Sequence, residues 1–452
     1  MKFTRSFAFL LGVFISPSFA HEKPNVILVM ADDQGWGDTS YNGHPNLKTP
    51  NLDQLAKEGL QMNRFYAASA VCSPTRGSAI AGQNPIRLGI PYANTGHLKP
   101  DAPNLAKLLK QQGYRTGHFG KWHLGTLSKT IKDANRGGKD DKHYAPPWDL
   151  GFDTCFSTES KVPTWDPMAL PAGQKDKRHW NALEEGAESS FYGTHYWVGE
   201  GKPVDPKTLS GCDSKLIMDQ ALSFIEKNAD DQPIFMVIWF HAPHWPVVAG
   251  PEYAARYEGH SDFEKNYWGC ISAIDDQMGR LKAKLKEKGM QNTLLCYASD
   301  NGPEGADPKT QGRRQGIGSA GHFTGRKRSL NEGGIRVPGI IHWPAKIASG
   351  RSSDSVACTT DYYPTICEVL SLPISEDSIC DGTSLLPLIE EKTTTRNKPL
   401  GFAIQKQRAW MDGDYKLLSK NGKDFQLYNI KSDPAEKTDL ATKQPEQFQK
   451  ML

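Results

Sequence analysis

The sequence predicts an α/β fold with a large, mostly parallel central sheet flanked by helices and a smaller antiparallel sheet in a C-terminal subdomain. Three observations predict this architecture. Apolar, β-rich segments alternate with helical segments over most of the chain, which is typical of a parallel sheet. Several apolar segments end in acids, histidines or amides. From about residue 391, short strand-like segments separated by Asp-Gly and Asn-Gly turns replace that alternation.

The composition is that of an ordinary globular protein. The chain has 452 residues, 38% of them hydrophobic, which is enough for one large unit with an appended module. Its 54 basic side chains nearly balance 51 acidic ones, for a net charge of +3. This balance gives no argument for a nucleic-acid partner, so specificity must come from local sites.

Three predicted strands carry polar residues directly after their carboxyl ends. They are residues 25–30 before Asp32 and Asp33, residues 234–240 before His241 and His244, and residues 293–298 before Asp300 and Asn301. In open α/β sheets the active crevice borders the carboxyl ends of the strands. Any one of these side chains alone could be a loop residue that faces water, but three such strand ends predict one shared site.

Helical patterns lie between these strands. Proline or a capping side chain marks several of their starts, and glycine marks several of their ends. The predicted helices are residues 49–59, 104–113, 215–228 and 275–289.

Two regions depart from this alternation. Residues 135–210 have little regular pattern and are rich in Trp, Tyr, Pro and charge. Long insertions are usually functional or disordered, and the aromatic content argues against disorder, so we expect a rim around the site. Strand-like runs at 401–404, 415–418 and 425–428 predict a C-terminal subdomain of residues 391–452, after a main domain of residues 21–390.

The first twenty residues have the pattern of a cleaved secretion signal. Lys2 and Arg5 precede an apolar run at 7–15, and Ser18-Phe19-Ala20 has the small-x-small form of a signal-peptidase site. The apolar run is far shorter than the ~20 residues that cross a bilayer, so a membrane anchor is the weaker alternative. We expect a secreted or periplasmic protein, cleaved near Ala20, with no membrane partner.

Export makes disulfides available to the eight cysteines. The cysteines form no C-x-x-C pair, which argues against metal binding through thiolates. A bridge from Cys358 to Cys367 or Cys380 is the pairing that we consider.

Two motifs carry a resemblance to a known family. Residues 72–76 have the form C-x-P-x-R, the segment in which sulfatases convert a cysteine into an aldehyde, although alone it could be a buried or bridged cysteine in a loop. Residues 113–123, G-Y-R-T-G-H-F-G-K-W-H, are long enough to be specific by themselves. Together with the strand ends, Lys327 and residues 332–338 in the family order, they make the chain resemble the formylglycine-dependent type I sulfatases of the alkaline phosphatase superfamily, bacterial polysaccharide sulfatases among them. The resemblance extends from Pro24 to the C-terminus, with residues 21–390 as the sulfatase catalytic domain.

This resemblance implies covalent catalysis at residue 72. A formylglycine-generating or anaerobic sulfatase-maturing enzyme would oxidise Cys72 to formylglycine. One hydroxyl of the hydrated aldehyde would attack sulfur, and loss of the proton from the second hydroxyl would expel sulfate and restore the aldehyde. Arg76 is implied to hold and polarise the hydrate.

The implied metal ligands are all oxygens. They come from Asp32, Asp33, Asp300, Asn301 and the modified Cys72. Such a set suits Ca²⁺, with Mg²⁺ as the lesser alternative. The cation would bind a sulfate oxygen and lower the pKa of the hydrate.

Lysines and histidines take the remaining implied roles. Lys121 and Lys327 resemble the pair that contacts the sulfate oxygens, although a flanking arginine could replace Lys327. His123 resembles the base that removes the hydrate proton, and His244 the acid that protonates the leaving alcohol. We expect His241 to be structural.

The resemblance predicts hydrolysis of a sulfate ester without naming the alcohol. Secretion and an aromatic rim favour a sulfated polysaccharide or oligosaccharide, because sugars stack on Trp and Tyr while Arg and His bind their anionic groups. An algal galactan such as carrageenan is the preferred substrate, with ulvan, fucoidan and glycosaminoglycans as alternatives. The candidate substrate-binding residues are His44, Arg87, His97, Lys161, Trp165, Arg178, His179, His195, Arg313 and Arg314.

Two other classes of protein share parts of this pattern. A phosphatase or phosphonate hydrolase of the same superfamily would carry the strand-end acids, but such enzymes typically use two metals with further Asp and His ligands. An inactive glycan-binding protein could retain the fold. The intact Cys72, Arg76, Lys121, His123 and His244 argue against that second alternative.

Overall fold

A computed structural model describes residues 23–133, 141–176, 178–229, 232–305, 317–374 and 379–452. The predicted secretion signal, Arg313 and Arg314 lie outside the described residues. Among the described residues, no helix combines the length and apolarity needed to cross a membrane.

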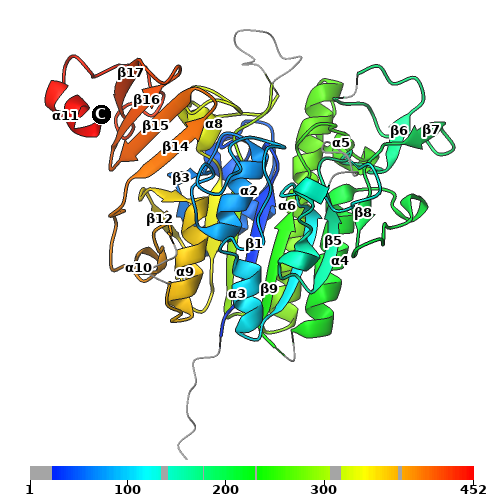
Figure 1. The fold of residues 1–452 in the computed structure, drawn as a ribbon. Coiled ribbons are helices and arrows are strands. Elements are labelled where there is room, and N and C mark those ends of the chain that lie inside the picture. Colours follow the sequence, from blue (N-terminus) through cyan, green and yellow to red (C-terminus); the bar gives the residue numbers. More distant parts are fainter. Residues whose placement is uncertain (1–22, 134–140, 177, 230–231, 306–316, 375–378) are drawn as a thin grey trace, which may run out of the picture.

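A nine-stranded sheet runs through the molecule in the order β12-β2-β11-β10-β1-β9-β4-β5-β8 (Figure 1). Its strands are β1 (Asn25–Ala31), β2 (Leu60–Met62), β4 (Arg115–Lys121), β5 (Thr154–Thr158), β8 (Tyr196–Trp197), β9 (Ile234–Trp239), β10 (Thr293–Ser299), β11 (Gly339–His342) and β12 (Arg351–Ser353). The five central strands, β10 to β5, pair in parallel. Strand β11 is antiparallel to both of its neighbours, and β8 is antiparallel to β5. The predicted mostly parallel sheet is confirmed.

Strand β1 is central because both of its faces are apolar. Val26, Leu28 and Met30 belong to one core cluster, and Ile27 and Val29 belong to another. Successive side chains of a strand point to opposite faces, so a continuous apolar run can be buried only between two layers of helices. The apolar run at 25–30 therefore predicts a strand at the centre of the sheet.

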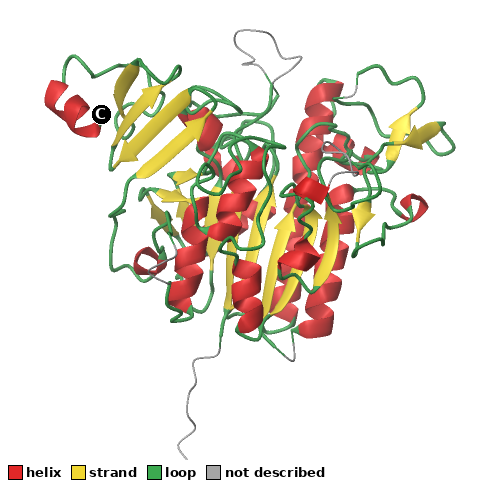
Figure 2. Ribbon diagram, viewed as in Figure 1, coloured by secondary structure: helices red, strands yellow, loops and turns green. Residues whose placement is uncertain are grey.

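Helices cover both faces of the sheet (Figure 2). One layer holds α2 (Cys72–Ala81), α3 (Leu105–Gln111), α9 (Tyr362–Val369) and α10 (Leu386–Ile389). The other holds α1 (Pro50–Glu58), α4 (Asp213–Asn228) and α6 (Asp262–Glu287). The short helices α5 (Pro251–Ala254) and α8 (Glu332–Ile335) and the two-stranded pair β3 (Phe65–Tyr66) and β13 (Ala357–Cys358) complete the main domain.

The predicted helices are present, and one is longer than expected. Helix α6 begins at Asp262 rather than near Asp275, because Ser261 and Glu264 form a capping box at its N-terminus. The S-x-x-E spacing was available in the sequence, but the helix that follows is buried on several sides and shows no clean apolar stripe.

The C-terminal region forms a separate four-stranded antiparallel sheet. Its strands are β14 (Leu400–Ile404), β15 (Gln407–Asp412), β16 (Tyr415–Ser419) and β17 (Phe425–Asn429), followed by α11 (Pro445–Met451). Three of these strands were predicted, and β15 was missed. One face of the sheet packs on Tyr66, Val71 and Ile335 of the main domain, so the C-terminal sheet shares a core with β3 and α8.

The insertion contains two small strands, β6 (Ala169–Pro171) and β7 (Ser189–Phe191), which pair as a hairpin. The hairpin lies at the upper right in Figure 1, on the opposite side of the molecule from the C-terminal sheet.

All eight cysteines are free, which corrects the bridge considered from Cys358. The Cys358 side chain lies in the core beneath the C-terminal sheet. Cys380 is held elsewhere, with its sulfur directed to the carbonyl oxygen of Gly82.

Candidate active site

The carboxyl ends of neighbouring parallel strands meet at one edge of the sheet. Strands β4, β9, β1 and β10 lie side by side, and the segments that follow them are joined by backbone hydrogen bonds. The amide of Asp32 donates to the carbonyl of Ala242 at 3.0 Å, and the amide of Asp300 donates to Ala31 at 3.1 Å. The expected gathering of strand-end residues is therefore present.

Helix α2 delivers Cys72 and Arg76 to the same edge. Cys72 is the first residue of the helix, and Arg76 follows one turn later on the same side. The Arg76 guanidinium donates to Asp300 Oδ2 from Nε at 3.0 Å and from Nη2 at 2.7 Å. It also donates to the carbonyl of Lys121 at 3.0 Å and lies over the ring of Trp239. One buried arginine thus fixes the helix against three strand ends.

Each of the two adjacent aspartates pairs with its own lysine. Lys121 Nζ lies 2.5 Å from Asp32 Oδ2, and Lys327 Nζ lies 2.7 Å from Asp33 Oδ1. Glu304 also contacts Lys327, at 3.3 Å. Arg328, a neighbour that could have replaced Lys327, is half-exposed and bound to Glu304 instead. Lys327 is therefore the cation of this segment that reaches the strand ends.

Burial and neighbouring charges shift the pKa values of the three aspartates in different directions. Burial raises the pKa of Asp33 to about 6 and that of Asp300 to about 7. At Asp32 burial acts in the same direction, but Lys121, His244 and Arg76 outweigh it and hold the pKa well below its ordinary value. Burial also raises the pKa of the Cys72 thiol to about 11.

Two of these residues hold unfavourable backbone conformations. Asp33 has a φ of +68° and His123 a φ of +57°, in the left-handed region that residues with a side chain rarely adopt. Such conformations cluster at functional sites, where the surrounding structure enforces them. Both residues were predicted to act in the site.

The donor set fits a hard divalent cation. Ligand atoms of Asp32, Asp33, Cys72 and His244 all lie within 4.8 Å of one another, so a thiol and an imidazole stand beside the carboxylates. Both oxygens of Asp300 already accept hydrogen bonds, from the amide of Asp33 and from Arg76. Among the described residues, Asp32 Oδ1 and Asn301 Oδ1 are buried acceptors with no hydrogen-bond partner. Asn301 Nδ2 donates to Asp33 Oδ1 at 2.7 Å, which turns its carbonyl oxygen to the unpartnered side. Buried oxygens without donors are what a cation such as Ca²⁺ would satisfy.

His123 and His244 lie at the centre, whereas His241 lies in a structural environment. His123 Nε2 lies 2.6 Å from Asn94 Oδ1, and His244 Nε2 lies 3.7 Å from Asp33 Oδ2. Burial, together with Lys327 and Lys121, holds the pKa of His244 well below its ordinary value against the opposing charge of Asp32. His241 is enclosed by Asp213 at 2.8 Å and Thr158 at 2.7 Å, the surroundings of a structural side chain.

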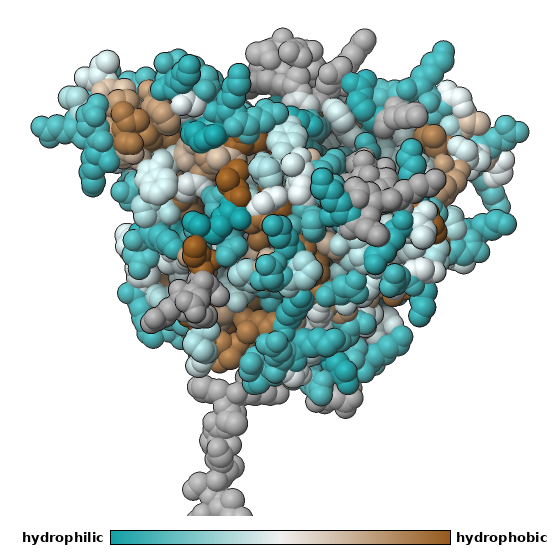
Figure 3. All heavy atoms as spheres, viewed as in Figure 1, coloured by the Kyte–Doolittle hydropathy of each residue, from teal (hydrophilic) through white to brown (hydrophobic). Residues whose placement is uncertain are grey.

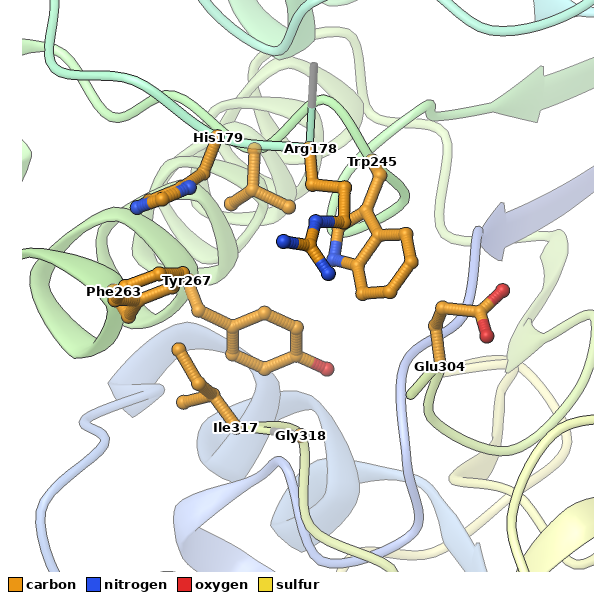
Figure 4. Close-up of a pocket in the computed structure, with 9 residues that line it drawn as sticks. Arg178, His179, Trp245, Phe263, Tyr267, Glu304, Ile317 and Gly318 are labelled. Carbon is orange, nitrogen blue, oxygen red and sulfur yellow. The ribbon is translucent and has the colours of Figure 1, made fainter. Parts of the chain in front are cut away.

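A recess opens beside this centre (Figure 4). Its wall holds Trp245, which follows His244, and Glu304, which contacts Lys327. Arg178 lies over the Trp245 ring at 5.8 Å and is gripped by Asp176 through two hydrogen bonds of 2.8 Å. The remaining lining is His179, Val247, Phe263, Tyr267, Ile317 and Gly318. Aromatic faces with a few charged groups form the wall of this recess, which has a volume of about 30 Å³.

The insertion reaches this recess through a backbone contact. The amide of Val247 donates to the carbonyl of Arg178 at 2.8 Å, and the ring of His179 stacks on Phe263 at 3.5 Å. The structure therefore places Arg178 and His179 in the lining of this recess. Lys161 lies close enough for Lys121 and Lys327, after burial, to lower its pKa.

None of the other candidate substrate-binding residues that the structure describes lines this recess. His44 Nδ1 accepts backbone N–H groups from its own turn, Trp165 packs on Gly250 in a satellite core, and His195 lies against Asp133. His97 lies against the ring of His143.

Arg87 is the clearest correction. It binds Asp381 at 3.0 Å, and the amide of Asp381 donates to Gly82, the residue that caps the C-terminal end of α2. Cys72 begins that ten-residue helix, so the two residues lie at opposite ends of an element about 15 Å long.

The prediction missed several residues at the centre. Asn94 holds His123, Glu304 contacts Lys327, and Trp245 lines the recess. Trp245 directly follows the H-x-x-H segment and Glu304 lies two residues after Gly302, so proximity to the motifs was the available signal. Nothing local distinguishes Asn94.

Comparisons with known proteins agree with this geometry. The sulfatase family model matches residues 24–372, and a model described as the C-terminal part of N-sulphoglucosamine sulphohydrolase matches residues 318–452. Mouse (Mus musculus) N-acetylgalactosamine-6-sulfatase is 31% identical over 81% of this chain and 66% of its own length. Rat (Rattus norvegicus) steryl-sulfatase is 30% identical over 81% of this chain and 70% of its own length. The chain thus spans about two thirds of the length of these relatives.

A solved structure agrees over nearly the whole chain. Ps i-CgsB, solved in complex with k-i-k-neocarrahexaose, superposes with a TM-score of 0.79 at 28% identity, covering 95% of this chain and 91% of that one. The fold, the strand-end constellation and the matched models together lead to one assignment. The chain belongs to the sulfatase family, has the alkaline phosphatase-like fold, and is by that membership a sulfuric ester hydrolase.

Proposed function

We propose that this chain hydrolyses sulfate esters on a sulfated galactan of the carrageenan type, through a formylglycine formed from Cys72 and with a bound Ca²⁺. One observation carries the proposal. Cys72, Arg76, Lys121, Lys327 and two unpartnered buried oxygens converge at one sheet edge. Such a convergence suits an anionic ester that must be held while its sulfur is attacked.

Asp32, Asp33, Asp300, Asn301 and residue 72 would hold the cation. When bound, the ion supplies Lewis acidity toward a sulfate oxygen and toward the hydrated aldehyde. The aldehyde hydrate supplies an oxygen nucleophile in place of the thiol. A maturation enzyme that reads the C-x-P-x-R segment would be the necessary partner, and the secretion signal would direct the chain to the periplasm or the exterior.

The lysines and histidines of the chain would handle charge and protons. Lys121 and Lys327 are buried cations at the sheet edge, positioned to neutralise sulfate oxygens as charge develops on them. His123, oriented by Asn94, would take a proton from the nucleophile. His244 would give a proton to the leaving alcohol, because a bound sulfate ester would offset the charges of Lys327 and Lys121 that help to lower its pKa. It directly precedes Trp245, which lines the recess.

The choice of galactan rests on the recess and on a likeness. Ps i-CgsB was solved with a neocarrahexaose, and its similarity to this chain favours that substrate class over ulvan, fucoidan or a glycosaminoglycan. The Trp245 ring offers a surface for a sugar ring, and Arg178 and Lys161 offer positive charge for further anionic groups.

Sulfate release from a panel of oligosaccharides tests the proposal. The panel holds carrageenan, ulvan, fucoidan and glycosaminoglycan fragments, and the protein is co-produced with a formylglycine-generating enzyme. We expect release from carrageenan fragments, conversion of residue 72 to an aldehyde by mass spectrometry, and loss of release in Cys72→Ala. Cys380→Ala, which changes a cysteine bound to Gly82, is the matched control and should retain activity.

Each contrary outcome has a defined meaning. Release from another glycan class alone would replace the galactan and retain the chemistry. Undiminished release in Cys72→Ala would overturn the formylglycine mechanism. Release that survives exhaustive chelation, with no ion detected in the protein, would overturn the role of the cation.

A further inference from the structure

The C-terminal sheet exposes one large aromatic side chain. Trp410 of β15 is 43% exposed, and its cross-strand partner in β14 is Gly401. A β-carbon at Gly401 would lie 3.2 Å from the indole ring, so the ring lies across the glycine. One side of the indole is thus supported by the neighbouring strand, and the remainder is open to solvent.

Only part of this sheet face is covered. Helix α11 and the segment before it pack on Leu417 and Leu427 of β16 and β17. The β14–β15 part, with Trp410 at its middle, borders two recesses of about 510 Å³ and about 380 Å³. Trp410 and Gly401 line both of them, so the two recesses form one surface on either side of the indole. Figure 3 shows apolar side chains gathered over the C-terminal sheet.

The side chains that line the two recesses carry more positive than negative charge. Among the described residues that line the two recesses, the basic side chains are Arg87, Lys398 and Arg408, and the one acidic side chain is Asp381. Asp381 is already paired with Arg87. Arg408 lies two residues before Trp410 in β15 and Asp412 two residues after it, so both share its face of the sheet. Of these two, Arg408 lines a recess and Asp412 lines neither. The surface offers an aromatic platform with an excess of cations.

This surface is separate from the candidate active site. Arg87 and Asp381 lie at the C-terminal end of α2 and Cys72 at its N-terminal end, about 15 Å apart along the helix. No residue that we assign to the catalytic centre lines either recess.

We propose that the Trp410 surface is a second binding site for a sulfated glycan chain, which holds the polymer while another part of it enters the active site. The inference rests on the proposed function for the nature of the glycan. An indole stacks on the face of a sugar ring, and Arg408 and Lys398 pair with sulfate groups of the same chain. Arg408 and Lys398 donate to backbone carbonyls, so a neutral glycan would leave them without an anionic partner, and a cationic or purely apolar partner would not match them.

Binding measurements in an inactive background test this site. In Cys72→Ala protein, Trp410→Ala and Arg408→Glu should each weaken affinity for the bound sulfated polymer by about fivefold or more, the scale of an aromatic or arginine anchor. The polymers are those of the release panel, each compared with its desulfated form. Phe191→Ala removes an equally exposed aromatic from the insertion, and Lys431→Glu reverses an exposed charge of the C-terminal region. Both controls should retain affinity.

The outcomes separate this site from the proposed function. In matured enzyme, Trp410→Ala should leave turnover of a small aryl sulfate unchanged while lowering turnover of polymer at low concentration. If polymer binding depends on Trp410 but no glycan is hydrolysed, the Trp410 site stands and the proposed substrate of the active site is wrong. Unchanged polymer affinity in both variants, or no polymer binding by the parent protein, would overturn the site. Loss of a dimer in Trp410→Ala with unchanged polymer affinity would assign the surface to a second copy instead.

Discussion

Among the described residues, the buried charge cluster at the sheet edge and the one beneath the C-terminal sheet are built differently. At the sheet edge, Asp32, Asp33 and Asp300 face Arg76 and two lysines, yet acceptor oxygens remain without donors. Beneath the C-terminal sheet, Lys416 binds Glu332 at 2.8 Å and Glu436 at 2.9 Å.

In the second cluster both carboxylates meet the same lysine, and Glu436 Oε1, which has no hydrogen-bond partner, lies 2.9 Å from the Lys416 ammonium. The second Glu332 oxygen accepts from Tyr66 at 2.7 Å, and the amide of Glu332 donates to Glu436 at 2.8 Å. Burial alone would raise the pKa of Glu332, but the positive charges of Lys416 and Arg336 outweigh burial and lower the pKa. A cluster whose members satisfy one another serves the fold, whereas one with unused oxygens is ready for an ion or a substrate.

Lys416→Met should produce the largest effect, and it should be on stability. Removing the lysine leaves two buried carboxylates without their shared partner, which costs about 3–5 kcal/mol. Chemical denaturation should show the loss, while residual activity per folded molecule stays near normal. Lys431→Met, at an exposed lysine, is the matched control. A change below about 1 kcal/mol would contradict the structural role given to this cluster.

Lys121→Met should have the opposite effect to Lys416→Met, with a large loss of activity and a small loss of stability. The lysine contacts Asp32 at the sheet edge, and loss of one charge-stabilising donor typically lowers kcat by about 10²–10³-fold. Thermal unfolding should change much less than in Lys416→Met, because Arg76 still faces Asp32 at 3.7 Å. Steady-state kinetics with an aryl sulfate measure the first effect. A variant that unfolds but turns over normally would show that Lys121 belongs with the structural cluster.

Ca²⁺ should stabilise the protein through the sheet-edge cluster, and this stabilisation should not depend on the Lys416 cluster. In Cys72→Ala protein, Ca²⁺ at about 100 times its dissociation constant should add about 2.7 kcal/mol to the free energy of unfolding. Asn301→Ala removes an unpartnered oxygen and should reduce the shift, while Lys416→Met should retain it. Equal shifts in all three proteins would place the ion elsewhere.

Asn94→Ala should give the smallest effect. Asn94 contacts His123 at 2.6 Å without reaching the acids, so its loss should lower kcat by about tenfold, a fraction of what a proton-transfer group contributes. Asn94→Asp keeps the acceptor oxygen and should retain more activity than the alanine variant. If both variants match the parent enzyme, His123 does not need this orientation.

The fold was predictable where its signals are local. The apolar run at 25–30 gave β1, and terminal proline, asparagine and glycine residues gave α1 and α3 nearly to the residue. Strand β15 escaped because its alternation, Arg408 and Trp410 against Ala409 and Met411, covers few residues. Its position is set by the strands on either side of it.

Part of the site was predictable from strand order, and Cys72, Arg76 and Lys327 were predicted from motifs. Asp32, Lys121, His244 and Asp300 follow parallel strands, so sheet topology alone brings them together. The rim is decided by how loops pack. Trp165 in the core and Arg178 at the recess come from the same insertion, and their sequence surroundings do not tell one from the other.

The Lys416 cluster also bears on how this chain can be divided. Glu332 begins α8, five residues after Lys327 of the active site, and its carboxylate is neutralised by a lysine from the other sheet. A fragment that ends before Leu400 would keep every proposed catalytic side chain but would bury Glu332 without Lys416. We therefore expect the C-terminal sheet to be inseparable from a working enzyme, so that recombination between sulfatases at residue 391 succeeds only when both halves carry matching members of this cluster.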